Sequence, residues 1–373
     1  MPLNNNTQVF LALVRAGLWE KEARLLPYGR VDYQEVMRLA EEQSVMGLVT
    51  AGLEHVADTT VPKVKLLQFI GETLQIEEQN KAMNNFIGVL MERLRKEGIC
   101  AVLVKGQGIA QCYERPMWRS SGDVDLLLDK ENYQKAKGFL SPQASHVNRE
   151  GEYNLHQALT IDHWEVELHG TMRTDLGRRI DGGIDKVQEE CFRSKEFRTW
   201  NNNGEEVPLP SPDNDVLFVF THILQHFFRG GIGLRQICDW CRLLWTFRSN
   251  LNVPLLERRL REMGLMTEWK AFAAFSVNTL GMPEEAMPLY EQGSWFQGAG
   301  SKILAYIMET GNFGHNRDGS YHQKYPFLVY KAISLWQTTK DSIRHLFIFP
   351  KDSVRIWWIM LTSGLGRAIR GIT

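Results

Sequence analysis

The stretch of sequence that best indicates the fold of this chain is Arg119-Ser-Ser-Gly122-Asp123-Val124-Asp125-Leu126-Leu127-Leu128. Successive side chains of a β-strand alternate between faces, so Asp123 and Asp125 share one face, about 6.5 to 7 Å apart along the strand, while the intervening apolar residues face a core. Two carboxylates this close repel each other unless a cation lies between them. Oxygen-only ligands favour a hard ion such as Mg²⁺. The stretch therefore predicts a strand that carries two metal ligands.

A second stretch, Trp164-Glu-Val-Glu-Leu-His169, alternates in the same way. Its polar face carries Glu165, Glu167 and His169, and either glutamate can supply a third carboxylate. Three converging carboxylates can hold two divalent ions roughly 3.5 to 4 Å apart, one lowering the pKa of an attacking hydroxyl and one stabilising a leaving pyrophosphate. The two strands together predict chemistry of the phosphoryl- or nucleotidyl-transfer type.

Upstream lies a candidate phosphate loop. A strand over 99–104 is followed by Lys105-Gly106-Gln107-Gly108 and by a short predicted helix over 107–113. Such a turn can bring backbone N–H groups and a helix N-terminus to a triphosphate, with Lys105 or Arg119 offsetting its charge. Glycines occur in strand-to-helix turns for geometric reasons alone, so this loop is weak evidence by itself.

Several of these motifs resemble those of a known family. Lys105-Gly106, Tyr113, Arg119-x-x-Gly122-Asp123-Val124-Asp125 and Val166-Glu167-Leu168-His169 are similar to the uncharacterised bacterial nucleotidyltransferase family within the DNA polymerase beta-like superfamily. The match is strong over about 100–170 and looser over 31–56 and 222–244. One departure is that Gln107 separates two glycines, where the wider superfamily usually has Gly followed directly by Gly or Ser.

The resemblance implies a role for each matched residue. Asp123, Asp125 and Glu167 would be the catalytic residues and would bind Mg²⁺ or Mn²⁺. Glu167 is preferred over Glu165 because it lies in the Glu-Leu-His match, and Glu165 stays the alternative. The resemblance also implies that the loop at Gly106 holds the nucleotide. Together with the loop geometry, this makes the candidate nucleotide-binding residues Lys105, Gly106, Gln107, Gly108, Arg119 and Gly122.

Further polar residues are candidates for the pocket of an acceptor substrate: Glu165, His169, His222, His226, Arg235 and Asp239. His222 and His226 are four residues apart and share a helix face, but no glutamate follows the first histidine as a zinc protease requires. Arg235 and Asp239 have the spacing of an ion pair on a helix surface. Cys238 and Cys241 have the spacing of a redox or zinc motif but fall in a helical pattern without a second such pair, so we assign them to packing.

The predicted fold class is α+β. A nucleotidyltransferase-type mixed β-sheet core over 99–210 is flanked by an N-terminal helical region over 1–98 and a C-terminal helical domain over 211–373. The N-terminal region shows helical periodicity over 31–56 and again from Pro62 to Gly98. The core is expected to contain strands at 99–104, 123–128, near 144–149, 154–161 and 164–169, a helix at 130–140, and a hairpin around Asn201–Gly204. Helices are predicted at 212–228, 234–248, 254–264 and 268–280.

The amino-acid composition disfavours some classes of binding partner and location. Lys plus Arg number 43 against 44 Asp plus Glu, a net charge of -1, so no global field attracts duplex nucleic acid, and a polymerase is disfavoured. Five scattered cysteines indicate a reducing compartment, and we expect a cytoplasmic protein. No apolar run reaches transmembrane length. The basic segment 351–373, with Trp357 and Trp358, is expected to dock on its own domain, with peripheral membrane or partner contact as the alternative.

The leading hypothesis is Mg²⁺-dependent transfer of a nucleoside monophosphate from an NTP to an unknown acceptor, with release of pyrophosphate. The acceptor is a small molecule, a protein or an RNA end, since the sequence does not distinguish them. The alternative is a non-catalytic relative of the same fold that binds a nucleotide or a protein. The altered glycine loop and the length of chain outside the core motivate this alternative.

Overall fold

The computed structural model describes residues 3–148, 155–314, 316 and 324–369. The β-structure near one end of the molecule is a five-stranded sheet with the strand order β1-β2-β5-β4-β3. The strands are β1 (Val102–Val104), β2 (Asp123–Leu127), β3 (His146–Val147), β4 (His156–Ile161) and β5 (Trp164–His169). β2 and β5 are parallel, and the other neighbours are antiparallel. The sheet is therefore mixed, and with the helices around it the predicted α+β class is confirmed.

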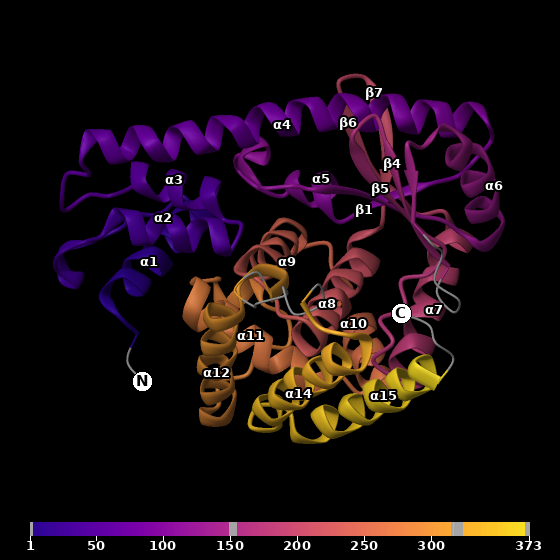
Figure 1. Ribbon diagram of the computed structural model, residues 1–373. Coiled ribbons are helices and arrows are strands. Elements are labelled where there is room, and N and C mark those ends of the chain that lie inside the picture. The colour runs from indigo at the N-terminus through magenta and orange to yellow at the C-terminus, as the bar shows by residue number, and fades with distance from the viewer. Residues whose placement is uncertain (1–2, 149–154, 315, 317–323, 370–373) are drawn as a thin grey trace.

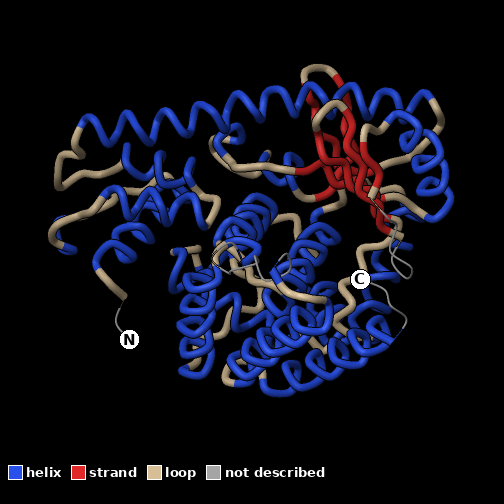
Figure 2. Tube along the Cα trace, viewed as in Figure 1, coloured by secondary structure: helices blue, strands red, loops and turns tan. Residues whose placement is uncertain are grey.

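Helices precede the sheet. α1 (Asn5–Trp19), α2 (Tyr33–Glu42) and α3 (Met46–Glu54) lie together at one end of α4 (Lys63–Lys96), a helix of 34 residues. Figure 1 shows α4 running from these three helices to the sheet, and Figure 2 shows the strands gathered at its far end. α4 ends where Gly98 adopts a positive φ of 67°, a conformation that glycine adopts readily.

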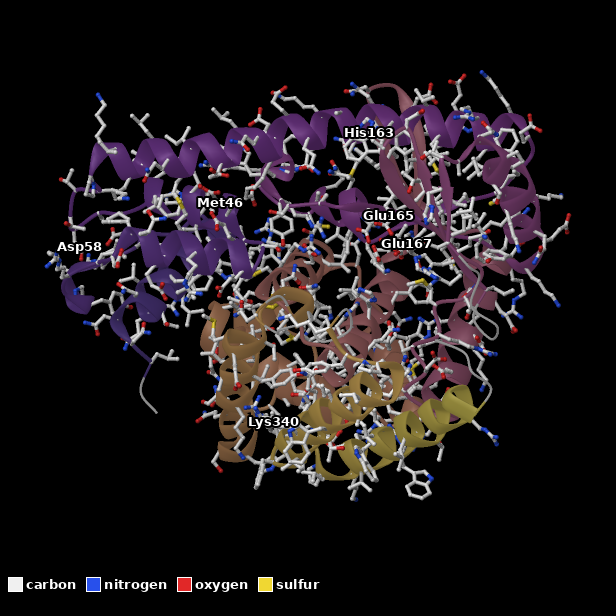
Figure 3. All side chains as sticks on the ribbon, in the orientation of Figure 1. Met46, Asp58, His163, Glu165, Glu167 and Lys340 are labelled. Atoms are coloured by element: carbon white, nitrogen blue, oxygen red, sulfur yellow. The ribbon has the colours of Figure 1, made fainter. Side chains whose placement is uncertain are left out.

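The sheet has one apolar and one polar face, as alternation predicts. Val124, Leu126, Val166 and Leu168 are buried against the C-terminal half of α4 and against α6 (Lys130–Leu140). The opposite face carries the acidic residues and lies toward the helices of the C-terminal part of the chain (Figure 3). A second β-element, the hairpin β6 (Arg198–Asn202) and β7 (Glu205–Leu209), packs beside β1 and α4. Its turn residues Asn203 and Gly204 both have positive φ.

The remaining helices include those that lie across a cavity from the polar face of the sheet. These remaining helices are α5 (Gly106–Ala110), α7 (Arg178–Ser194), α8 (Pro212–Arg229), α9 (Leu234–Phe247), α10 (Val253–Met263), α11 (Met266–Leu280), α12 (Ser294–Thr310), α14 (Phe327–Leu346) and α15 (Pro350–Ile369). The four helices predicted between 212 and 280 are present within two residues at each end. α7 was not predicted, and α5 is shorter than the expected 107–113.

Two apolar clusters form the core. One joins α1 to α3 with α7 to α12, and the other joins the sheet with α4, α6 and β7. The division into regions 1–98, 99–210 and 211–373 stays a prediction. Residues 149 and 154, at the ends of two predicted strands, lie outside the described residues, as does Arg370 of the basic tail.

Two further features of the chain are its longest apolar helices and its cysteines. Among the described residues, no helix is both long enough and apolar enough to cross a membrane. All five cysteines are free, and Cys238 and Cys241 are buried on α9. Contact of α15 with a membrane or a partner stays a prediction.

Candidate active site

Three carboxylates converge on the polar face of the sheet. Asp123 and Asp125 come from β2, and Glu167 comes from the adjacent parallel strand β5, where it lies opposite Asp125. One carboxylate oxygen from each of the three lies within 4.8 Å of the others. Glu165 lies opposite Asp123 but is exposed, and it is outside this three-carboxylate cluster (Figure 3). The geometry thus brings Glu167, and not Glu165, to the aspartate pair.

Lys105 reaches the cluster from the turn after β1. Its Nζ lies 2.8 Å from Oδ1 of Asp125. Lys105 and Gly106 both have positive φ, 55° and 38°, which ends β1 abruptly and starts α5. Burial acts to lower the pKa of Lys105, but the surrounding carboxylates outweigh it and the pKa is raised. A charged ammonium group therefore stands beside the carboxylates.

The cluster has the electrostatics of a cation site. The negative charge of Asp125, and then burial, raise the pKa of Asp123 to about 6. Burial acts to raise the pKa values of Asp125 and Glu167 as well, but hydrogen bonds from histidines and the charge of Lys105 hold both below their usual range. The three carboxylates offer only oxygen atoms as ligands and lie close together. A hard divalent ion prefers such a set of ligands. The residues present therefore fit Mg²⁺ or Mn²⁺.

A cavity of about 170 Å³ opens beside the cluster. Its floor comes from the sheet side of the molecule, and its opposite wall comes from α8 and α9. The lining residues are Lys105, Gly106, Ile109, Arg119, Asp123, Asp125, Glu167, Val219, His222, Ile223, His226, Arg235, Gln236 and Asp239. Residues more than 100 positions apart in the sequence therefore share one cavity.

The two histidines of α8 are uncharged at neutral pH. Their rings lie 4.3 Å apart between centroids and meet edge to face. Burial, and then the charge of Lys105, lower the pKa of His226 to about 4 and hold that of His222 well below its usual range. Both rings line the cavity, and a neutral imidazole ring carries one N–H donor and one acceptor nitrogen.

Arg119 lines the cavity, but its guanidinium group is also hydrogen-bonded to other side chains. Its Nε and Nη2 donate to Oδ1 and Oδ2 of Asp239 at 2.8 and 2.7 Å, and its Nη1 donates to Ser121 Oγ at 2.8 Å. Both side chains of the pair are only 5% exposed. The expectation that Asp239 lies on a helix surface was wrong, because Asp239 is buried in its pair with Arg119. Binding of a nucleotide by Arg119 stays a prediction.

The chain matches a family model. The family is described as uncharacterised nucleotidyltransferases, and the match covers residues 29–279, more than half of the chain. The chain belongs to this nucleotidyltransferase family. The membership predicted from the motifs at 105–125 and 166–169 is thereby confirmed.

A solved structure of an antigenic nucleotidyltransferase-like protein from Paracoccidioides brasiliensis is also similar. The sequences are 16% identical, and the aligned region covers 53% of this chain and 92% of that one, with a TM-score of 0.33. None of the curated proteins compared with the chain is a match.

Some residues that the sequence assigned to the nucleotide do not reach the cavity. Gln107 is buried on the far side of α5, where its Nε2 donates to Asn80 Oδ1 at 2.7 Å. A Cβ at Gly108 would lie 2.8 Å from Leu209 Cδ2, so this glycine permits close packing against β7. Gly122 is not among the lining residues. The loop contributes Lys105 and Gly106 to the lining of the cavity and uses Gln107 and Gly108 for packing.

Two of the six proposed acceptor-pocket residues also lie outside the cavity, Glu165 and His169. His169 instead hydrogen-bonds to Asp125, with Nε2 2.7 Å from Oδ1.

Residues that sequence reasoning missed include His156 on β4 and the apolar Ile109, Val219 and Ile223 of the cavity wall. A signal for His156 existed. Asp162 and His163, both at positive φ, form a two-residue turn between β4 and β5. Such a turn fixes the register and places His156 opposite His169.

Proposed function

We propose that this member of the nucleotidyltransferase family is an active, metal-dependent enzyme that transfers a nucleoside monophosphate from an NTP to a hydroxyl or phosphate acceptor. The observation that supports this most is the meeting of Asp123, Asp125 and Glu167 within 4.8 Å of one another at the edge of a cavity. These three side chains would hold Mg²⁺ or Mn²⁺. The ion would supply charge stabilisation to the transferring phosphoryl group.

The triphosphate would be bound by Lys105 and Arg235. Both line the cavity, and they approach it from opposite walls, β1 and α9. At about 170 Å³ the cavity is smaller than the roughly 300 to 1,000 Å³ of sites that enclose a drug-sized ligand. We therefore place the phosphates inside and the base toward the cavity mouth. Neutral His222 and His226 would face the acceptor.

In the reaction an acceptor oxygen would attack the α-phosphorus, and the bond from that phosphorus to the bridging oxygen would break. Pyrophosphate leaves with the electron pair of this bond. We assign the proton of an acceptor hydroxyl to Glu167, because its side chain is 22% exposed whereas that of Asp125 is 2% exposed. Five free cysteines suit a reducing compartment, so we place the reaction in the cytoplasm.

The test uses α-labelled NTPs, Mg²⁺ or Mn²⁺, and fractionated cell extract as the source of acceptor. The wild-type chain should release pyrophosphate and label one fraction. Asp123→Asn should lower this transfer by about 10² to 10³-fold, since it removes electrostatic stabilisation at the reacting phosphate. Glu165→Gln is the matched control, because this carboxylate lies on the same sheet face but outside the cluster, and it should retain transfer.

Two outcomes would reject the proposal. One is an Asp123→Asn variant that transfers as well as the wild type. The other is calorimetric binding of an NTP that depends on metal while no pyrophosphate ever appears, which would support the non-catalytic alternative.

A further inference from the structure

A second group of side chains of types that can ligate a metal lies beside the three-carboxylate cluster. It consists of His156 on β4 and of Glu167 and His169 on β5, and we call it the histidine cluster. The antiparallel register of β4 and β5 places His156 directly opposite His169. Glu167 precedes His169 by two residues, so all three side chains share the polar face of the sheet.

The distances within the histidine cluster are those of a coordination shell. Nε2 of His156 lies 3.3 Å from Oε2 of Glu167, and Nε2 of His169 lies 3.2 Å from the same oxygen. The two imidazole rings are 4.9 Å apart between centroids. A tetrahedral ion with bonds of about 2.0 to 2.1 Å has edges of about 3.3 Å between its ligands. Both nitrogen–oxygen edges already have this length without an ion.

The donor set differs from that of the three carboxylates. Two imidazole nitrogens and one carboxylate oxygen suit Zn²⁺, Co²⁺ or Mn²⁺, whereas Mg²⁺ prefers oxygen ligands and retains water. Two histidines and a glutamate leave a coordination position open, as in zinc sites that bind water or substrate. The histidine cluster should therefore discriminate between divalent ions where the three-carboxylate cluster does not.

The surroundings permit an ion to reach this position and connect it to the active site. The side chain of His156 is 40% exposed, so the cluster is open to solvent on that side. On the other side Nε2 of His169 lies 2.7 Å from Oδ1 of Asp125, which also pairs with Lys105, so this hydrogen bond joins the histidine cluster to the three-carboxylate cluster. Glu167 belongs to both clusters.

We propose that His156, Glu167 and His169 form a second divalent-cation site, selective for a transition-metal ion over Mg²⁺, which shares Glu167 with the three-carboxylate cluster. The proposal concerns metal binding by the free protein and does not require that the chain transfers a nucleotide.

The test titrates the metal-free full chain with Co²⁺ in the absence of NTP and follows the visible absorption of the ion, with Zn²⁺ added in competition. The wild type should show a Co²⁺ band that Zn²⁺ removes and that excess Mg²⁺ does not. His156→Ala should weaken Co²⁺ binding by at least about 100-fold, because it removes a direct ligand and even partners behind a ligand contribute 10- to 100-fold.

His163→Ala is the matched control. His163 is an exposed histidine of the same hairpin, lies in the turn away from Glu167 (Figure 3), and is outside both clusters. It should bind Co²⁺ like the wild type. Asp123→Asn, which keeps all three ligands of the histidine cluster, should retain the band that Zn²⁺ removes.

The proposal is overturned if His156→Ala binds Co²⁺ as tightly as the wild type, if Mg²⁺ displaces Co²⁺ from the wild type at comparable concentration, or if the absorption is lost in Asp123→Asn and kept in His156→Ala. The proposed function fails separately, by the absence of pyrophosphate release, so the two failures are distinguishable.

Discussion

Asp239 on α9 binds the guanidinium group of Arg119 through two parallel hydrogen bonds of 2.8 and 2.7 Å, although 120 positions separate the two residues. The hydroxyl of Tyr113 donates to the same carboxylate at 2.7 Å. Tyr113 and Arg119 both belong to the motif that resembles the family. The motif therefore has two roles. It carries the carboxylates of β2, and through Tyr113 and Arg119 it binds α9, which forms one wall of the cavity.

Removing one partner of this pair should destabilise the protein strongly. Arg119→Ala leaves the buried carboxylate of Asp239 without its ion pair, and such losses cost about 3 to 5 kcal/mol. Chemical denaturation measures the loss. Arg95→Ala is the comparison, since Arg95 forms an exposed ion pair with Glu205 that is worth about 0 to 1 kcal/mol. Equal losses for the two variants would show that Arg119 has no special structural role.

Arg235 should be the arginine that binds phosphate. It lines the cavity, and its Nη1 donates to Ser120 O at 2.9 Å, which fixes its direction. Burial, and then the charge of Arg119, lower its pKa, so an anion beside it would be favoured. Arg235→Ala should weaken metal-dependent NTP binding by about 10- to 100-fold, the range for a hydrogen bond to a charged group.

Calorimetric titration measures this effect. Arg248→Ala, at the exposed C-terminal end of α9, is the control and should bind as the wild type does. If Arg235→Ala binds the NTP with wild-type affinity, the triphosphate does not occupy this wall of the cavity.

Gln107 should affect stability and not nucleotide affinity. It is 1% exposed, and its amide is bonded to Asn80 on α4, away from the cavity. Gln107→Ala leaves a buried acceptor without this donor, which costs about 1 to 3 kcal/mol. The free energy of unfolding and the NTP affinity are measured on the same preparation. A large loss of affinity with unchanged stability would instead return Gln107 to the phosphate loop that the sequence suggested.

Glu268 should make stability depend on pH. It lies on α11 and is 1% exposed, and burial, followed by the nearby carboxyl group of Asp352, raises its pKa well above its usual range. The folded protein therefore holds a proton that the unfolded chain releases. This contribution is fully present below the unfolded pKa of about 4.3 and is lost as the pH rises through the folded pKa.

Glu268→Gln stays neutral, so its unfolding free energy should exceed that of the wild type by an amount that grows with pH, up to about 1.4 kcal/mol per unit. Denaturation at a series of pH values from 4 upward measures the difference. In an Asp352→Asn background the growth should be smaller, because one cause of the raised pKa is gone. A difference that stays constant across the series would contradict the assignment.

The sequence predicted those features that depend only on the pattern of residues within one segment. The period of two in 123–128 and 164–169 predicted both strands and their polar faces, because side-chain direction in a strand depends only on the residue's position. Helix positions between 212 and 280 followed from the period of 3.6 and from Ser211-Pro212. α7 was missed although Ile180, Ile184, Val187 and Cys191 recur at helical spacing, because the adjacent glycines Gly182 and Gly183 inside the stretch suggest a loop.

The sequence alone did not determine which side chains of distant segments come into contact. Glu165 and Glu167 share a face in any strand, and only the packing of β5 beside β2 and under α8 leaves the first exposed and brings the second to Asp125. The partner of Arg119 and the shared cavity of Lys105 and Arg235 likewise depend on which surfaces pack together. Local periodicity encodes the direction of a side chain, whereas its neighbours are set by burial of the whole apolar surface, to which every segment contributes at once.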